Sequence, residues 1–363
     1  MSETPFRLGR GDHAPAFRAP ALSGSPTYAF DTVGGRHVLM LFFGSTDFPP
    51  VAEALALVQR ERDLFDDYQA CFFGVTINPA DVRRGRIEQQ LPGIRYFLDY
   101  DRAVSGRYGA IADKQYLPHW LLLDPTLRVI ESFAIGDGAE AMAMLRGCLE
   151  SPFPEGAWAP VLRVPDVLDP EMCRHLIQLY EENGGEASGF MRDVEGKTRM
   201  IFDPEHKTRR DFIIADERLT RTLAASLARR LNPALEKAFQ FRATRIERYL
   251  VACYEAGAGH FRPHRDNTTK GTAHRQFAVT INLNADDYDG GDLRFPEYGP
   301  RLYRAPTGGA VVFSCALLHE AVPVTRGRRF AFLPFLYNVE GAKLREANNP
   351  HLGPELNEYR MSG

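Results

Sequence analysis

A short segment rich in proline and glycine, SPFPEGAWAP at residues 151–160, separates two parts of the 363-residue chain with different hydrophobic patterns. Before it, apolar runs such as HVLMLFF (37–43) and ACFFGVTI (70–77) alternate with helix-like segments such as VAEALALVQRERDLF (51–65). After residue 240, short strand-like runs such as HRQFAVTINLN (274–284) follow one another with turn residues between them. The first pattern indicates an α/β sheet covered by helices, and the second an antiparallel sandwich or barrel. The sequence therefore predicts two domains joined by this segment.

The composition narrows the classes of protein to which the chain can belong. Hydrophobic residues make up 44% and charged residues 25%, so each domain can bury a core, and the net charge of −3 argues against a surface that coats nucleic acid. The five cysteines are scattered without a CxxC pair, which predicts reduced thiols of an intracellular protein. We find no signal-peptide pattern and no apolar run long enough to span a membrane, and expect a cytoplasmic protein.

The stretch ACYEAGAGHFRPHRDN (252–267) contains candidate metal ligands. If residues 261–266 form a strand, His264 and Asp266 project from one face. His260 and His264 would converge only on a helix, which the nearby glycines and Pro263 disfavour. His319, between two predicted strands, is a candidate third ligand, and two histidines with one carboxylate suit a non-haem ferrous ion. The alternative is that His264 and Asp266 are surface polar residues near a turn.

Arg329 opens the predicted strand RFAFLPFLYN, in which Arg329, Ala331, Leu333 and Phe335 share one face. An arginine on an otherwise apolar inward face needs an anion, because an unpaired buried guanidinium is very costly. A carboxylate fits its planar fork. Arg326 and Arg328 are interpreted as solvated turn residues.

Three stretches, ACYEAGAGHFRPHRDN, TINLNADDYDGGDLRFPE and PTGGAVVFSCALLHEAVPVTRGRRFAF, resemble the double-stranded β-helix core of iron(II)- and 2-oxoglutarate-dependent oxygenases of the prolyl 4-hydroxylase type. The resemblance covers about residues 160–340. It implies a hydroxylase that uses Fe(II), 2-oxoglutarate and O2, with ascorbate as a candidate reductant. The residue roles that it implies are iron ligation by His264, Asp266 and His319, binding of the distal carboxylate of 2-oxoglutarate by Arg329, and a place beside the metal and cosubstrate for Tyr254. Asn282 stands where the hypoxia-type relatives carry a tyrosine at that carboxylate, and Phe335 where they carry a tryptophan.

The first part of the chain resembles the thioredoxin-fold proteins of the peroxiredoxin group, through MLFFGSTDFPPVA, FFGVTINP, FLDYDRAVSGRYGAI and LPHWLLLDPTLRVI. Peroxiredoxins act through a thiolate in a Pro-x-x-x-Thr-x-x-Cys loop, and this chain has Ser45, Pro49 and Ala52 at those three places. Cys71, the first cysteine, is predicted to be a buried strand residue. Pro118 stands where thioredoxin folds often have a cis-proline. The domain is interpreted as a degenerate redoxin used for packing, dimerisation or choice of partner.

These observations predict a thioredoxin-like α/β domain over 1–152, a linker over 153–159, a double-stranded β-helix (jelly roll) with flanking helices over 160–340, and a C-terminal tail over 341–363. The expected activity is hydroxylation of an unactivated carbon in a protein, a peptide or a small molecule, with a prolyl group as the leading candidate. The alternative is a redoxin-like partner-binding or oxygen- and redox-sensing protein with an incidental oxygenase core. A homodimer is expected, and a membrane or nucleic-acid partner is not.

Residues 203–216 are predicted to form a strand pair and loop at the mouth of the pocket. The candidate substrate contacts there are Arg209, Arg210 and Asp211, and a solvated charged hairpin is the alternative interpretation.

Overall fold

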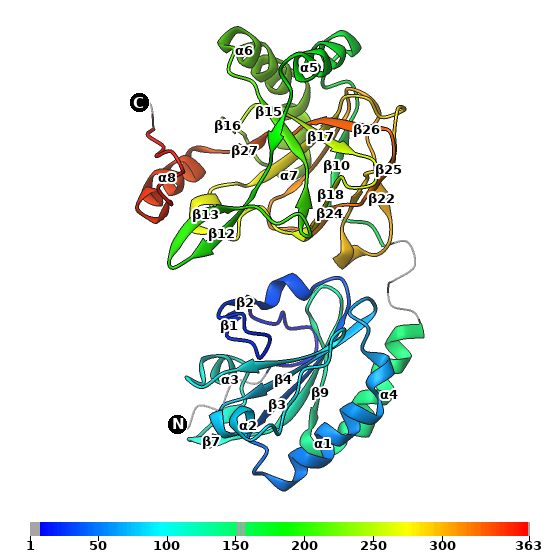
Figure 1. Cartoon of the computed structure of the whole chain (residues 1–363), viewed down its shortest axis with the longest axis vertical. Helices are drawn as coiled ribbons and strands as arrows, with labels where there is room; N and C mark the ends of the chain where they lie inside the picture. Colours follow the sequence, from blue (N-terminus) through cyan, green and yellow to red (C-terminus); the bar gives the residue numbers. More distant parts are fainter. Residues whose placement is uncertain (1–7, 151–152, 154–156, 362–363) are drawn as a thin grey trace. The chain divides into compact units, whose positions relative to one another are not determined.

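The computed structural model describes residues 8–150, 153 and 157–361. The chain divides into two compact units, one made of residues up to Trp158 and the other of most residues from Ala159 onward (Figure 1). The predicted linker at 153–159 lies partly outside the described residues. No described helix is long and apolar enough to cross a membrane.

The first unit is built on a five-stranded sheet in the order β5-β4-β3-β8-β9. Strands β3, β4 and β5 are parallel, whereas β8 and β9 are antiparallel to their neighbours. Every residue of β3 is buried, which is why its sequence is one continuous apolar run rather than an alternating one. The strand bounds are β3 His37–Gly44, β4 Ala70–Thr76, β5 Ile94–Leu98, β8 His119–Leu123 and β9 Val129–Ala134.

Helices α1 (Pro49–Arg60) and α4 (Gly138–Glu150) cover one face of this sheet, where Val51 and Leu145 pack with Leu41 of β3 (Figure 1). The opposite face packs against residues 8–33, which precede the sheet in the chain, and against the short helix α3 (Ala103–Arg107). The shorter elements are β1 Arg18–Ala19, β2 Tyr28–Ala29, α2 Pro79–Arg83, β6 Ile111–Ala112 and β7 Gln115–Tyr116. The predicted α/β thioredoxin-like fold is confirmed.

The two largest sheets of the second unit are both antiparallel. The larger has nine strands, with a main path β10-β23-β19-β26-β17-β15-β11 and with β16 and β27 at its side. Its strands are β10 Leu162–Val164, β11 Glu186–Ala187, β15 Arg210–Ile213, β16 Arg245–Glu247, β17 Leu250–Glu255, β19 Phe277–Asn282, β23 Ala310–Ser314, β26 Arg328–Phe332 and β27 Phe335–Tyr337. The smaller sheet has the order β14-β18-β24-β21-β22, with the bounds β14 Lys207–Thr208, β18 His260–His264, β24 His319–Ala321, β21 Leu293–Arg294 and β22 Leu302–Tyr303.

Successive side chains of β17 point alternately to the two faces of the large sheet. Val251 and Cys253 belong to the cluster that packs against helices α5 (Pro170–Asn183), α6 (Glu217–Ser226) and α7 (Asn232–Phe239). Leu250, Ala252 and Tyr254 face the other way and pack with Phe261 and Ala321 of the small sheet. Side chains that alternate in this way are typical of a β-sandwich core. The predicted β-rich fold with flanking helices is confirmed. Asp169 caps helix α5, where Met172 N donates to its side chain at 2.9 Å.

The predicted C-terminal tail contains most of helix α8 (Val339–Ala347), in which Ala342 is fully buried. Two local predictions were wrong. Residues 203–216 do not form a strand pair, because β14 joins the small sheet through β18 and β15 joins the large sheet through β17. Among the described residues the cis peptide bond is Leu91–Pro92, so Pro118 does not follow one.

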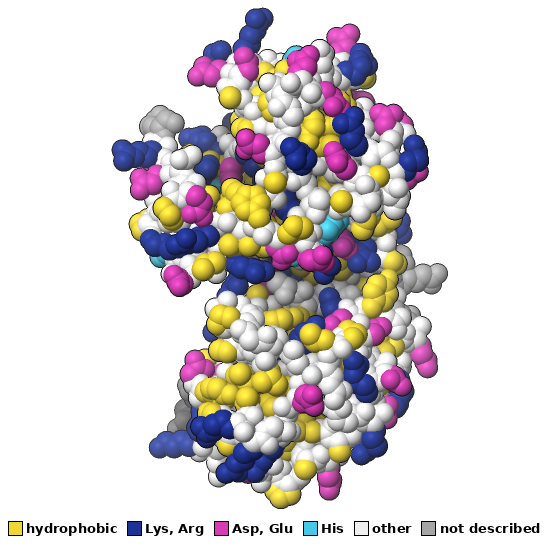
Figure 2. All heavy atoms as spheres, viewed as in Figure 1, with side chains coloured by type: hydrophobic (Ala, Val, Ile, Leu, Met, Phe, Trp, Pro, Cys, Tyr) yellow, Lys and Arg dark blue, Asp and Glu magenta, His cyan; other side chains and the backbone are white. Residues whose placement is uncertain are grey.

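The remaining strands of the second unit form two antiparallel pairs. One is the hairpin of β12 (Phe190–Val194) with β13 (Lys197–Ile201), and the other joins β20 (Asp289–Gly290) to the distant β25 (Val324–Arg326). On the face of the molecule drawn in Figure 2, basic and acidic side chains are interspersed rather than gathered into one basic stripe.

Candidate metal and cosubstrate site

Three side chains with metal-ligating atoms converge between the small sheet and the turn that follows β18. His264 ends β18, Asp266 lies in the turn after it, and His319 opens β24. One ligand atom from each lies within 4.8 Å of the others. Asp266 is 3.6 Å from His264 Nε2 and 3.4 Å from His319 Nε2, through its two different oxygens. One ion of ordinary coordination distances could therefore contact all three.

A bulge and a turn, rather than a continuous strand, produce this arrangement. The register shifts between Phe261↔Ala321 and His264↔His319, so β18 has one residue more than β24 between the two pairs. The strand ends at His264, and Asp266 N donates to Cys315 O at 2.9 Å. The prediction that residues 261–266 form one strand was wrong, although the two side chains it grouped do come together.

The backbone fixes both imidazole rings in the orientation that a metal ligand needs. His264 Nδ1 lies 2.8 Å from Arg262 O, and His319 Nδ1 lies 3.0 Å from Leu317 O. A carbonyl only accepts, so each Nδ1 donates a proton to its carbonyl and each Nε2 is left facing the space between the three side chains, where an ion would lie. The ring of Phe261 stacks on His264 at 3.4 Å between centroids, which further restricts that ring.

Burial sets the charges that the cluster would offer to a cation. Burial, and then the neighbouring His319, lower the pKa of His264 to about 4. Burial alone would raise the pKa of Asp266, but His319 and His264 hold it below its ordinary value. At neutral pH the site therefore offers a neutral imidazole at His264 and an ionised carboxylate at Asp266, the forms that bind metals.

A buried ion-pair cluster that sequence reasoning missed supports Asp266. Glu247 accepts from Arg275 Nη2 at 2.6 Å and from His274 Nε2 at 2.7 Å. Arg275 Nη1 also donates to Asp266 O at 3.4 Å. The adjacent His274 and Arg275, which open the predicted strand-like run 274–284, were the sequence signal for this cluster, but Glu247 is 27 residues away from His274 in sequence.

Arg329 is the candidate anion-binding residue, and it is only 2% exposed. It pairs with Tyr254 across β26 and β17, and its guanidinium carbon lies 5.0 Å from the Tyr254 ring centre. Its Nε has no hydrogen-bond partner, and it forms no ion pair with any described residue. Arg328 is exposed and pairs with Glu181 at 2.6 Å. The predicted face of Arg329 is thus confirmed at the start of the strand, whereas Phe335 opens the separate strand β27.

Asn282 lies opposite Ala331, two residues from Arg329 along β26. Its Nδ2 donates to Ala305 O at 2.7 Å, and its buried Oδ1 has no partner among the described residues. Arg329 Nε and Asn282 Oδ1 are buried polar atoms that a ligand could satisfy.

The three candidate substrate contacts separate into two groups. The buried Arg209 forms an ion pair at 2.6 Å with Asp211, which is partly buried, and Arg209 Nη1 donates to Tyr254 Oη at 3.3 Å. Arg210 lies opposite Cys253, on the helix-covered face, and donates to Gly185 O. Sequence reasoning missed Lys207, which donates to Ser188 Oγ at 2.6 Å and lies 4.9 Å from the Phe261 ring.

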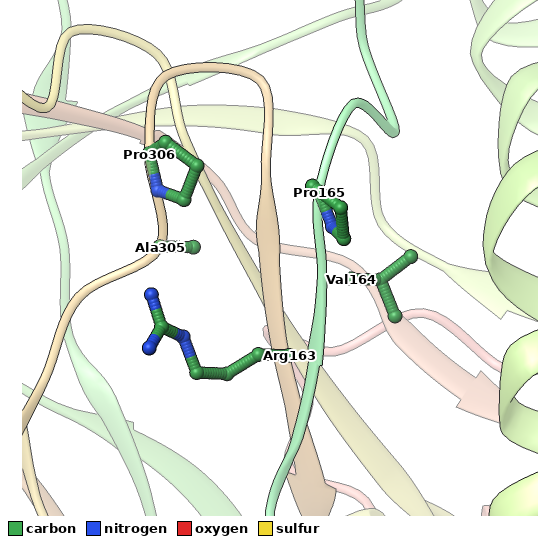
Figure 3. Close-up of a pocket in the computed structure, with 5 residues that line it drawn as sticks. All are labelled: Arg163, Val164, Pro165, Ala305 and Pro306. Carbon is green, nitrogen blue, oxygen red and sulfur yellow. The ribbon is translucent and has the colours of Figure 1, made fainter.

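His260 lies outside the cluster, as the sequence predicted. Its Nδ1 is 2.7 Å from Ala258 O and its Nε2 is 3.3 Å from Glu205 O. A different feature of this unit is a shallow pocket of about 260 Å3 (Figure 3). None of its lining residues (Arg163, Val164, Pro165, Ala305 and Pro306) is a candidate ligand.

Each unit matches a known family over part of its length. Residues 249–337 match the 2OG-Fe(II) oxygenase superfamily, and residues 10–135 match the AhpC/TSA family. The first match contains all three candidate ligands, Tyr254, Asn282 and Arg329. The second contains Ala52 and Cys71.

Individual relatives agree with the first match. A PKHD-type hydroxylase from Synechococcus sp. (strain JA-2-3B'a(2-13)) is 32% identical over 26% of this chain and 44% of the relative, so the chain spans less than half of that protein. A PKHD-type hydroxylase from Polaromonas sp. (strain JS666) is 28% identical over 47% of this chain and 75% of the relative. Among solved structures, a viral collagen prolyl hydroxylase from Paramecium Bursaria Chlorella virus-1 has a TM-score of 0.38 and 15% identity, and covers 50% of this chain and 97% of that one.

Proposed function

Because the chain carries a domain of the 2OG-Fe(II) oxygenase superfamily behind a domain of the AhpC/TSA family, we propose that it is an iron(II)- and 2-oxoglutarate-dependent hydroxylase. The observation that carries the proposal is the combination of the His264, Asp266 and His319 cluster with a buried, unpaired Arg329. It would hydroxylate an unactivated carbon of its substrate, and the first candidate is a prolyl group of a protein, a peptide or a small molecule. PKHD-type hydroxylases among its relatives support the reaction class.

The described residues fit both iron(II) and 2-oxoglutarate. His264, Asp266 and His319 would hold iron(II), since two imidazoles and one carboxylate on one side of an ion leave positions open for a cosubstrate and oxygen. Arg329 would bind the far carboxylate of 2-oxoglutarate through its fork of donors. Iron(II) with 2-oxoglutarate and dioxygen supplies an oxidation in which 2-oxoglutarate loses carbon dioxide to give succinate, and one oxygen atom enters a C–H bond of the substrate.

The protein itself contributes orientation and a dry environment. Arg262 O and Leu317 O hold the two imidazoles so that Nε2 points toward the ion position. Buried apolar residues line the inner face, which is the side of the large sheet that packs against the small sheet, and they exclude water from around Arg329. They are Leu250, Ala252, Val324, Ala331 and Leu333. A guanidinium in such surroundings binds a carboxylate more strongly than one in water does.

The first unit has no peroxidatic cysteine in this proposal. Ala52 lies inside helix α1, and burial raises the pKa of the Cys71 thiol to about 12, so that this thiol is protonated at neutral pH. The prediction that Cys71 is a buried strand residue is confirmed. We propose that this unit binds a partner or the substrate protein rather than peroxide.

Incubation with iron(II), 2-oxoglutarate, air and a cell extract tests the proposal. We expect succinate to form and a component of the extract to gain the mass of one oxygen atom. The His319→Ala variant should produce neither change. If the wild-type protein binds iron(II) but consumes no 2-oxoglutarate with any extract, the partner-binding alternative replaces the hydroxylase.

A further inference from the structure

Arg248 occupies an unusual position between β16 and β17. Its backbone has a left-handed φ of 55°, which a side chain other than glycine adopts at some cost. Its Nε donates to Leu333 O at 3.1 Å, and its guanidinium carbon lies 4.2 Å from the Phe335 ring centre. The side chain is therefore fixed against the segment that leads from β26, which carries Arg329, into β27.

No described carboxylate neutralises Arg248. The adjacent Glu247 is used by Arg275 and His274. Asp211 gives one oxygen to Arg209 and Ser188, and its other oxygen accepts no hydrogen bond, so Arg248 does not use it either. Burial, followed by the positive charges of Arg209 and Arg275, lowers the pKa of Arg248 to about 10. An anion beside the guanidinium would remove this penalty.

Arg248 lies on the metal side of the inner face. Phe335 contacts Arg248, and the guanidinium carbon of Arg275 lies 4.2 Å from the same ring. Arg275 in turn donates to Asp266 O. Leu333 O, which accepts from Arg248, lies four residues beyond Arg329, or roughly 13 Å along an extended chain. Arg248 is therefore anchored at a different place on the inner face from Arg329.

The side chains of the inner face carry more positive than negative charge, and bound iron(II) and 2-oxoglutarate would not change this difference. Among the described lysine, arginine, aspartate and glutamate side chains, those that interact there are five cations, Lys207, Arg209, Arg248, Arg275 and Arg329, and three carboxylates, Asp211, Glu247 and Asp266. Iron(II) and 2-oxoglutarate bring equal and opposite charges. Burial, and then Arg209, lower the pKa of Lys207 well below its ordinary value. Even with Lys207 neutral, one positive charge remains.

We propose that Arg248 binds a carboxylate of the substrate, and that the oxygenase unit selects substrates with an acidic group near the carbon that is oxidised. The inference rests on the proposed hydroxylase function and adds a substrate class to it. The carboxylate could belong to an acidic side chain of a peptide or to a free small-molecule acid, and both present the same group to a guanidinium.

Two sets of probes distinguish a peptide carboxylate from that of a free small-molecule acid. The first is a series of capped, fluorescent peptides with one proline, in which a glutamate is moved stepwise along either side and is compared with glutamine at the same place. The second is free L-proline compared with L-prolinamide. Binding is measured without oxygen, by fluorescence anisotropy for the peptides and by calorimetry for the small molecules, with and without iron(II) and 2-oxoglutarate.

In the wild-type protein, one acidic probe should bind about tenfold or more tightly than its amide partner. Arg248→Gln should abolish that difference, Arg248→Lys should keep part of it, and Arg248→Glu should reverse it toward a lysine peptide. Arg242→Gln removes an equal charge from an exposed residue of the preceding loop and should keep the full difference. Thermal unfolding checks that each variant is folded.

The results separate this inference from the proposed function. A difference between acid and amide that depends on Arg248, without any consumption of 2-oxoglutarate, would leave the substrate class standing and refute the hydroxylase. Equal binding of acid and amide by the wild-type protein, failure of both to bind, or an unchanged difference in Arg248→Gln would overturn the role of Arg248.

Discussion

Replacement of Arg329 by alanine tests the cosubstrate site in isolation from the metal. The guanidinium is 2% exposed, forms no ion pair with a described residue, and lies among apolar side chains. Truncating one partner of a buried, charge-assisted pair costs roughly 2–5 kcal/mol. The dissociation constant of 2-oxoglutarate should therefore rise on the order of 30-fold or more. Iron(II) affinity should stay close to that of the wild type, because Arg329 is not among the three converging ligands.

Anaerobic calorimetric titration of 2-oxoglutarate into the iron(II)-loaded protein measures this constant. Arg329→Lys should recover part of the loss, because a point charge remains but the two-pronged geometry does not. Arg328→Ala is the matched control, since it removes only a surface pair with Glu181 and should change the constant by less than about threefold. A large effect of Arg328→Ala, or none of Arg329→Ala, would refute the assignment of Arg329.

Three further predictions concern different parts of the chain. Gly291→Ala should weaken 2-oxoglutarate binding in the same titration and spare iron binding, because Gly291 has a φ of 68° and an added Cβ would meet Arg329 Cδ at 3.0 Å. Burial, and then Arg192, lower the pKa of His206 from 6.5 to about 4. As the pH falls through this interval, the unfolded chain binds a proton at His206 before the folded chain does. The free energy of unfolding should therefore decrease with falling pH. Urea denaturation at several pH values should show a shallower decrease in His206→Phe, and equal slopes would contradict this. The protein should not consume hydrogen peroxide with a thiol reductant, and peroxide consumption that Cys71→Ser removes would show that this thiol is reactive.

The parts of the fold that the sequence predicted are those in which local pattern and tertiary environment agree. Strand β3 is buried along its whole length, so a continuous apolar run was sufficient to identify it. Strand β26 alternates between the helix-covered face and the inner face, which separated Arg329 from Arg328.

The predictions that failed depended on contacts between distant segments. Residues 207–213 form two strands that join different sheets, and their partners lie in β18 and β17. Asp266 reaches the site through a turn held by Cys315 O, about fifty residues later in the chain. The Glu247, His274 and Arg275 cluster and the unpaired Arg248 also required the folded structure, because sequence spacing does not show which carboxylate each cation contacts.

The central claim, that His264, Asp266 and His319 hold iron(II), is tested most directly by anaerobic equilibrium dialysis with metal analysis. The wild-type protein should bind one iron(II) per chain, and the binding should be lost in His264→Ala, Asp266→Ala and His319→Ala. His260→Ala should bind iron like the wild type, because both of its ring nitrogens face backbone carbonyls outside the cluster. Iron retained in all three ligand variants, or lost in His260→Ala alone, would contradict the account.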